Sequence, residues 1–200
     1  CYYLEFRVFI HPPAIFVTYL FSLIKLTPNF VSFLTTVFSL GALYFYIQES
    51  YFIALLLFFF RTVLDYVDGA LARYTNQCTK FGKYLDLTID YVFFLSFWAY
   101  LAYAHGDMGI YILFVTILYT LTIDYFVEPR LNSLIQREPI KQFFMKKGFI
   151  LGFAPFGLFE LWVFVTSLMG VISELMPYFI VLMFADLIYR VYEVVRFSKN

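Results

Sequence analysis

The stretch DYVDGALARYTNQCTKFGKYLDLTID, residues 65–90, holds four of the seven aspartates in a chain of 200 residues. The chain around it is 62% hydrophobic and only 14% charged, with a mean hydropathy of +0.79. Soluble globular domains carry about 25% charged residues, so this composition indicates an integral membrane protein. A cluster of acidic residues in such a chain needs a specific physical reason.

Apolar runs on both sides of this stretch predict six transmembrane helices, since a helix needs about 20 residues to cross a hydrocarbon core of about 30 Å. The predicted spans are residues 30–47, 51–74, 82–104, 109–128, 148–170 and 174–195. Residues 12–26 are apolar but too short, and they predict an amphipathic helix at the membrane interface. The expected fold is therefore an all-α polytopic membrane protein, with an N-terminal segment 1–28 and a transmembrane domain 29–200. Because the chain opens on Cys1 rather than methionine, a further extramembrane domain upstream is left open.

Lysine and arginine residues are distributed unevenly among the predicted connections. They flank the second and fourth connections and the two ends of the chain, whereas the segments IQES, AHGDMG and GVISE contain none. Cytoplasmic loops carry the excess of Lys and Arg, so both termini and the aspartate-rich connection are expected on the cytoplasmic side. The basic residues form no single stripe, which argues against nucleic acid as a partner.

Helical phase brings the polar residues of the quoted stretch onto two faces. Five residues of the first segment fall within an arc of about 140° on a helical wheel: Asp65, Asp68, Gly69, Ala72 and Arg73. In the second segment Gly82, Asp86 and Asp90 follow one another at intervals of four residues and form one stripe. A short connection makes the two helices antiparallel neighbours, so the four carboxylates are expected to converge.

Four carboxylates at a membrane surface require neutralisation, because each uncompensated charge near a span centre costs about 2.5–3.5 kcal/mol. Oxygen ligands without nearby His or Cys favour a hard cation, Mg²⁺ or Mn²⁺. Four carboxylates are enough for two such ions, an arrangement suited to phosphoryl transfer. Two alternatives remain open from the residues alone: a solvated connection with no ion, and the cation site of a channel or transporter.

The pattern D-x2-D-G-x2-A-R-x8-G-x3-D-x3-D resembles the signature of the CDP-alcohol phosphotransferases, and all eight of its positions are present between Asp65 and Asp90. The resemblance implies a homodimeric membrane transferase of phospholipid, related polar-lipid or inositol-phosphate biosynthesis. Such an enzyme moves a substituted phosphate from a CDP-linked donor, such as CDP-diacylglycerol, to an alcohol and releases CMP. The alternative from another functional class is a non-catalytic membrane protein that transports or binds divalent cations.

The resemblance also implies roles for individual residues. Asp65, Asp68, Asp86 and Asp90 are the expected metal ligands, and Asp90 is in addition the expected general base for the acceptor hydroxyl. The expected contacts of the cytidine diphosphate are Pro28, Asn29, Phe30, Val31, Gly69, Ala72, Arg73 and Thr79. These residues identify neither the donor nor the acceptor, because they bind the cytidine diphosphate that all donors share.

Charged residues in the later spans are candidates for the acceptor pocket, since intramembrane charges are functional suspects. The candidates are Asp124, Glu128, Arg130, Lys141 and Arg190. An ion pair between Asp124 or Glu128 and a basic residue such as Arg190 is the structural alternative. The basic residues after the fourth span have two interpretations: they bind an anionic acceptor, or they only mark the cytoplasmic side of the membrane.

Overall fold

The computed structural model describes residues 11–122, 126 and 158–197. These residues form helices and no strand, in agreement with the all-α prediction. They belong to two compact units. The first contains the described residues of 5–97 and 161–168, and the second contains those of 98–160 and 169–200. Each unit is described by itself.

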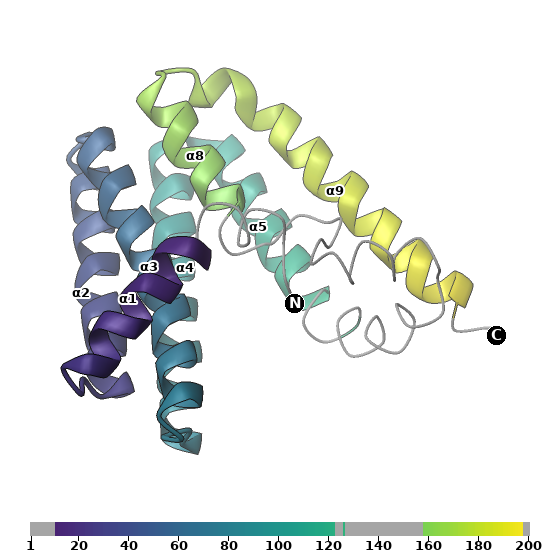
Figure 1. Cartoon of the computed structure of the whole chain (residues 1–200). Coiled ribbons are helices and arrows are strands. Elements are labelled where there is room, and N and C mark those ends of the chain that lie inside the picture. The colour runs from purple at the N-terminus through teal and green to yellow at the C-terminus, as the bar shows by residue number, and fades with distance from the viewer. Residues whose placement is uncertain (1–10, 123–125, 127–157, 198–200) are drawn as a thin grey trace. The chain divides into compact units, whose positions relative to one another are not determined.

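The first unit is built on α2 (Pro28–Ile47) and α3 (Tyr51–Tyr74), with α1 (His11–Leu23) packed against α3 (Figure 1). Pro28 occupies the first turn of α2, where the missing N–H of proline would have no helical partner in any case. The buried cluster that joins these three helices consists of Ala14, Val31, Val63, Leu64, Val67 and Leu71. Ala14 is fully buried, and its small side chain lets α1 approach closely.

The end of α3 is defined by a tight backbone cap. The N–H of Gln77 donates to the carbonyl of Ala72 at 2.8 Å, and the N–H of Asn76 donates to that of Arg73 at 3.4 Å. Asn76 has a φ of 55°, the left-handed conformation that this cap requires and that asparagine tolerates. Residues 75–79 are all that separates α3 from α4 (Lys80–Ala104), so the chain turns back at once into an antiparallel helix.

Part of α8 (Leu158–Leu168) completes the first unit through an aromatic cluster. The ring of Phe164 lies 4.7 Å from that of Phe58 and 5.1 Å from those of Tyr46 and Phe97, measured between centroids. The hydroxyl groups of Tyr46 and Ser167 are 2.6 Å apart and share a hydrogen bond. Buried rings in such tilted and stacked contacts stabilise this part of the bundle.

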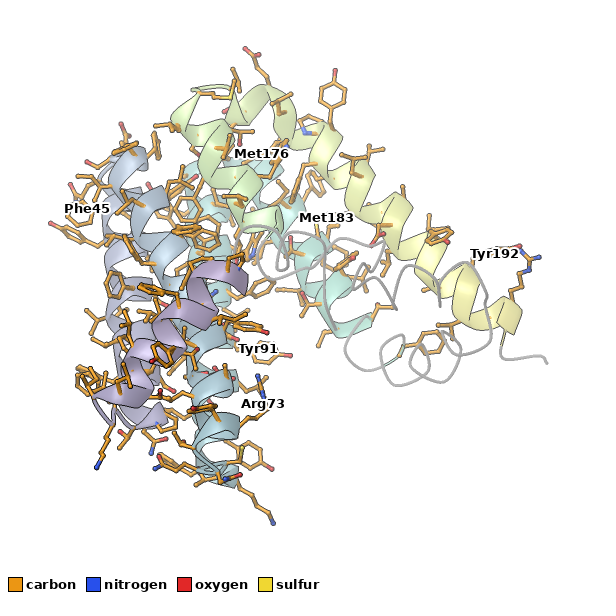
Figure 2. The ribbon with its side chains drawn as sticks, viewed as in Figure 1. Phe45, Arg73, Tyr91, Met176, Met183 and Tyr192 are labelled. Carbon is orange, nitrogen blue, oxygen red and sulfur yellow. The ribbon has the colours of Figure 1, made fainter. Side chains whose placement is uncertain are left out.

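The second unit contains α5 (Gly106–Thr122) and α9 (Ile172–Phe197), which pack against each other. The hydroxyl of Tyr119 on α5 donates a hydrogen bond to Asp186 on α9. One turn earlier, Thr116 Oγ1 lies 3.8 Å from Sδ of Met183, which Figure 2 labels on α9. A polar stripe on α5 thus meets one face of α9.

Three of the described helices are long and apolar enough to cross a membrane: α2, α4 and residues Ile172–Arg196 of α9. The 24 residues of α3 are long enough too, but they include four charged side chains. The 13 residues of α1 extend over about 20 Å, which is too short for a crossing. Residues 123–125 and 127–128 of the fourth predicted span and residues 148–157 of the fifth lie outside the described residues.

The outward face of α2 is apolar, as expected for a helix in contact with lipid. Its residues Phe33, Val37, Leu40 and Tyr44 follow the helical repeat, and between 48% and 61% of each is exposed. The opposite face buries Ser32, Thr35 and Ser39 against the rest of the unit. The described helices are therefore those of an integral membrane protein.

Candidate active site

Three carboxylates from two helices meet in the first unit. Asp65 lies on α3, Asp86 and Asp90 lie one turn apart on α4, and one oxygen of each falls within 4.8 Å of the others. The helical phase and the short connection predicted from the sequence account for this arrangement. Ionised carboxylates at such distances repel one another, so the group requires a positive partner.

The fourth aspartate of the pattern, Asp68, is bound from α2 and is not part of this group of three. Ser32 Oγ donates to Asp68 Oδ2 at 2.7 Å, and the Asp68 side chain is 5% exposed. Three residues of helix rotate Asp68 by about 60° from Asp65, which turns it toward α2 rather than directly toward α4. The position of Ser32 could not be inferred from the pattern, because it depends on how α2 packs on α3.

Arg61 is a site residue that the sequence analysis missed. It lies one turn before Asp65 on α3, its side chain is 3% exposed, and it forms an ion pair with Asp90. Its guanidinium also lies 4.9 Å from the ring centroid of Phe93 on α4. The spacing of four residues before Asp65 is the available signal, whereas in the sequence analysis the basic residues near the second connection serve only as markers of membrane sidedness.

The residues present fit a divalent cation. Oδ1 of Asp65 is buried and accepts no hydrogen bond from the described residues, so it is ready to act as a ligand. The neighbouring donor atoms are carboxylate oxygens of Asp86 and Asp90, and hard cations such as Mg²⁺ and Mn²⁺ prefer oxygen ligands. The second oxygen of Asp68 is the remaining candidate ligand on α3.

Gly69 and Arg73 lie one turn apart near the end of α3. A Cβ atom at Gly69 would lie 3.4 Å from Nη1 of Arg73, which shows that the guanidinium folds back over the glycine. Arg73 is exposed and projects from the side of the helices in Figure 2, while Ala72 is half-buried. An exposed guanidinium over a glycine leaves room for a planar or anionic group beside it.

The first turns of α2 and α4 lie close together. Thr79 Oγ1 accepts a hydrogen bond of 2.9 Å from the N–H of Gly82, which makes Thr79 the N-cap of α4. A Cβ atom at Gly82 would lie 3.1 Å from that oxygen and 3.6 Å from Oδ1 of Asn29 on α2. The first turn of α4 thus lies beside Asn29 in the first turn of α2, and each of these helix N-termini carries a partial positive charge.

The other predicted nucleotide contacts at the start of α2 differ in exposure. Pro28 opens the helix, and Phe30 is 46% exposed and packs against Phe33. Val31 is fully buried in the cluster between α1, α2 and α3, so a contact from Val31 to a ligand would have to come from its backbone.

Most predicted acceptor residues fall outside the described part of the chain. Asp124, Glu128, Arg130 and Lys141 lie there, and Arg190 is on α9 but its side chain is outside the description as well. In the second unit, Asp186 on α9 accepts a hydrogen bond from the Tyr119 hydroxyl on α5. This bond gives Asp186 a structural role in joining the two helices.

The model of the CDP-alcohol phosphatidyltransferase family matches residues 25–192, which include every described residue of this site. The chain belongs to the CDP-alcohol phosphatidyltransferase family. Members use divalent metal ions, and the cluster of Asp65, Asp86 and Asp90 is suited to hold one.

Individual relatives of this chain are similar over shorter segments. A CDP-diacylglycerol–glycerol-3-phosphate 3-phosphatidyltransferase of Aquifex aeolicus is 40% identical over 76 residues, which cover 38% of this chain and 42% of that protein. The corresponding protein of Haemophilus influenzae is 47% identical over 51 residues, 26% of this chain and 28% of its own. An archaetidylinositol phosphate synthase of Pyrococcus horikoshii is 37% identical over 65 residues, 32% and 35% of the two chains. Each similarity thus covers less than half of the relative.

Proposed function

We propose that this CDP-alcohol phosphatidyltransferase transfers a substituted phosphate group from a CDP-linked lipid donor to the hydroxyl group of an acceptor alcohol and releases CMP. The single observation that carries the proposal is the group formed by Asp65, Asp86 and Asp90 across two helices of the family motif. A phosphoryl-transfer site needs such a group, because it must hold cations against an anionic donor.

The metal ligands in this proposal are Asp65, Asp68, Asp86 and Asp90, which would hold two ions of Mg²⁺ or Mn²⁺. When bound, the ions neutralise the diphosphate oxygens and stabilise the negative charge on the leaving CMP. The chain itself supplies the orientation of the ligands. Ser32 fixes one oxygen of Asp68, and Asp65 presents an oxygen that has no other hydrogen-bond partner among the described residues.

Asp90 is the proposed general base. The acceptor oxygen forms a bond to the β-phosphorus of the donor as the bond from that phosphorus to CMP breaks, and the hydroxyl proton passes to Asp90. Asp90 is one turn further along α4 than Asp86, away from the exposed connection and nearer to where a membrane-bound reactant would lie. Its carboxylate is 25% exposed, so it is open to a substrate.

The cytidine diphosphate is proposed to lie over Gly69 and Arg73, with its phosphates toward the first turns of α2 and α4. The guanidinium folded over Gly69 supports this placement, since it can bind phosphate oxygens in a bidentate manner. Asn29 and Thr79 flank the same region through their proximity to Gly82. The remaining predicted contacts are Pro28, Phe30, Val31 and Ala72.

The proposed assembly is a homodimer in which each subunit has six membrane spans. We place α1 at the membrane–water interface, and both termini and the active site on the cytoplasmic side. The uneven distribution of Lys and Arg supports the orientation. The 13 described residues of α1 support an interfacial position, because a helix of this length is too short to cross the membrane.

We propose a phosphorylated alcohol as the acceptor. The names of two relatives include glycerol-3-phosphate and archaetidylinositol phosphate, and in both the alcohol part carries its own phosphate. The basic residues between α5 and α8, among them Arg130 and Lys141, offer the charge that an anionic acceptor needs. Asp124, Glu128 and Arg190 remain candidates for the same pocket.

An acceptor screen tests this proposal. Purified protein is mixed with CDP-diacylglycerol or an archaeal ether equivalent, Mn²⁺ and one alcohol at a time, and CMP release and the lipid product are measured. We expect product with glycerol phosphate or inositol phosphate, and none after chelation of the metal or in Asp86→Asn. Absence of product with every donor and acceptor would contradict the proposed reaction, and product with an uncharged alcohol alone would contradict the proposed acceptor.

A further inference from the structure

Arg61 is a buried cation in direct contact with the proposed general base. Its side chain is 3% exposed, and it pairs with Asp90, which is 25% exposed. An arginine so deeply buried is rare unless a specific partner compensates its charge. The roles assigned so far to the aspartates, to Arg73 and to the helix N-termini leave Arg61 without a function.

Three features fix the position of Arg61: the helical repeat of α3, the ring of Phe93 and the carboxylate of Asp90. The helical repeat of α3 places it one turn from Asp65, on the same side of the helix. Phe93 lies on α4, three residues after Asp90. The centroid of its ring is 4.9 Å from Cζ of Arg61. An aromatic ring favours a cation over its face, so Phe93 and Asp90 hold the guanidinium at one side of the carboxylate group.

Electrostatics places Arg61 in competition with a metal ion. Arg61 attracts both Asp90 and Asp86, whereas Asp65 repels both. A divalent cation held by these carboxylates would be repelled by the fixed positive charge, and it would also share Asp90 with the guanidinium. The guanidinium binds Oδ1 of Asp90, so only part of that carboxylate is left for a metal ion or a hydroxyl proton.

We propose that Arg61 is a positioning residue for the general base. It holds one oxygen of Asp90 and weakens the attraction between that carboxylate and a divalent cation, so Asp90 stays oriented toward the acceptor. This inference rests on the proposed function, because it concerns the same general base. It gives Arg61 two effects of opposite sign: Arg61 weakens metal binding and speeds transfer.

The test replaces Arg61 by glutamine and measures metal binding and transfer separately. Binding of Mn²⁺ alone, followed by electron paramagnetic resonance without any donor, should be at least about threefold tighter in Arg61→Gln, because a positive charge near the ion is lost. The kcat for CMP release at saturating Mn²⁺ should fall at least about tenfold, because Asp90 loses its orientation. The KM for the donor should stay within about twofold, since Arg61 lies about two turns of α3 before Gly69 in the proposed nucleotide region.

Two further variants serve as controls. Arg61→Lys keeps the charge and should keep the Mn²⁺ affinity of the wild type, with a kcat between those of wild type and Arg61→Gln. Arg196→Gln removes another arginine that lies over an aromatic ring, 6.0 Å from the Tyr192 centroid on α9, and should change neither quantity. If Arg61→Gln does not fold in detergent, Arg61→Met, which keeps an unbranched apolar stem without the charge, replaces it in both measurements.

The outcomes separate this inference from the proposed function. Weaker or unchanged Mn²⁺ binding in Arg61→Gln, or an unchanged kcat, would overturn the role of Arg61 while wild-type transfer stands. Wild-type protein that binds Mn²⁺ but shows no transfer with any donor would overturn the proposed function, and the role of Arg61 as a partner of the general base with it.

Discussion

Ser32 Oγ on α2 donates a hydrogen bond of 2.7 Å to Oδ2 of Asp68 on α3. The bond joins residues that are 36 positions apart, and both side chains are at most 5% exposed. A carboxylate in such a buried place needs a donor, because an unsatisfied charged group is costly. Helix α2 therefore contacts the candidate site through this hydroxyl.

Replacement of Ser32 by alanine should lower transfer activity about tenfold, because a hydrogen bond to a charged group contributes about 1.5 kcal/mol and its loss leaves Asp68 free to rotate. CMP release at several Mn²⁺ concentrations measures the effect. Ser39→Ala is the matched control, since Ser39 is equally buried on the same face of α2 but donates to the carbonyl of Thr35. Equal losses in the two variants would show that the hydroxyl of Ser32 has no special role.

Asp90→Asn should retain donor binding and lose transfer by at least about 100-fold, because an amide keeps the shape of the carboxylate but cannot accept the proton. Binding of CDP and release of CMP are measured on the same preparation. Asp107→Asn, at an exposed aspartate in the first turn of α5, is the control and should behave as wild type. Near-normal turnover of Asp90→Asn would exclude Asp90 as the base.

Gly69→Ala should raise the KM for the CDP-linked donor about tenfold without loss of stability. The added Cβ atom would lie in ordinary contact with the Arg73 guanidinium, 3.4 Å from Nη1, and it would occupy space proposed for the nucleotide. The helix itself should gain up to about 1 kcal/mol, since alanine is the better helix former.

Gly41→Ala on α2 serves as the comparison for Gly69→Ala, because its Cβ atom would meet the flexible end of Leu57 at 3.3 Å, in the apolar part of the bundle. We expect its donor KM to match that of the wild type. A Gly69→Ala enzyme with unchanged KM would move the nucleotide away from this part of α3.

Thr79→Ala should destabilise the start of α4 by about 1 kcal/mol, because the N–H of Gly82 loses the cap that Thr79 Oγ1 provides. Thermal unfolding in detergent detects the loss, and donor binding should weaken with it because the first turn of α4 flanks the proposed diphosphate site. Thr79→Ser keeps the capping oxygen and should restore both. If Thr79→Ser fails in the same way as Thr79→Ala, the methyl group rather than the cap is responsible.

The fold and a large part of the site were predictable from local sequence. Helical phase placed Asp65 on one face of α3 and put Asp86 and Asp90 in one stripe on α4, and a connection of five residues forces the two helices together. Apolar length predicted the bounds of α2, α3 and α4 to within two residues. Such features depend on residues close to one another along the chain, so a sequence contains them directly.

Contacts between distant segments were not predictable in the same way. The direction of Asp68 toward Ser32, the pairing of Arg61 with Asp90 and the proximity of Asn29 to Gly82 each depend on how one helix is rotated against another. Rotation is set by the packing of side chains such as Val31, Val63 and Val67, and no spacing rule encodes it.

The sequence by itself therefore determined that this protein lies in a membrane, that Asp65 on one helix faces Asp86 and Asp90 on the next, and that these carboxylates suit a divalent cation. The tertiary structure decided which carboxylates form the group of three and which polar side chains orient them. The physical reason is that helical phase is a local property of the backbone, whereas the partner of a buried charge is chosen by the packing of the whole unit.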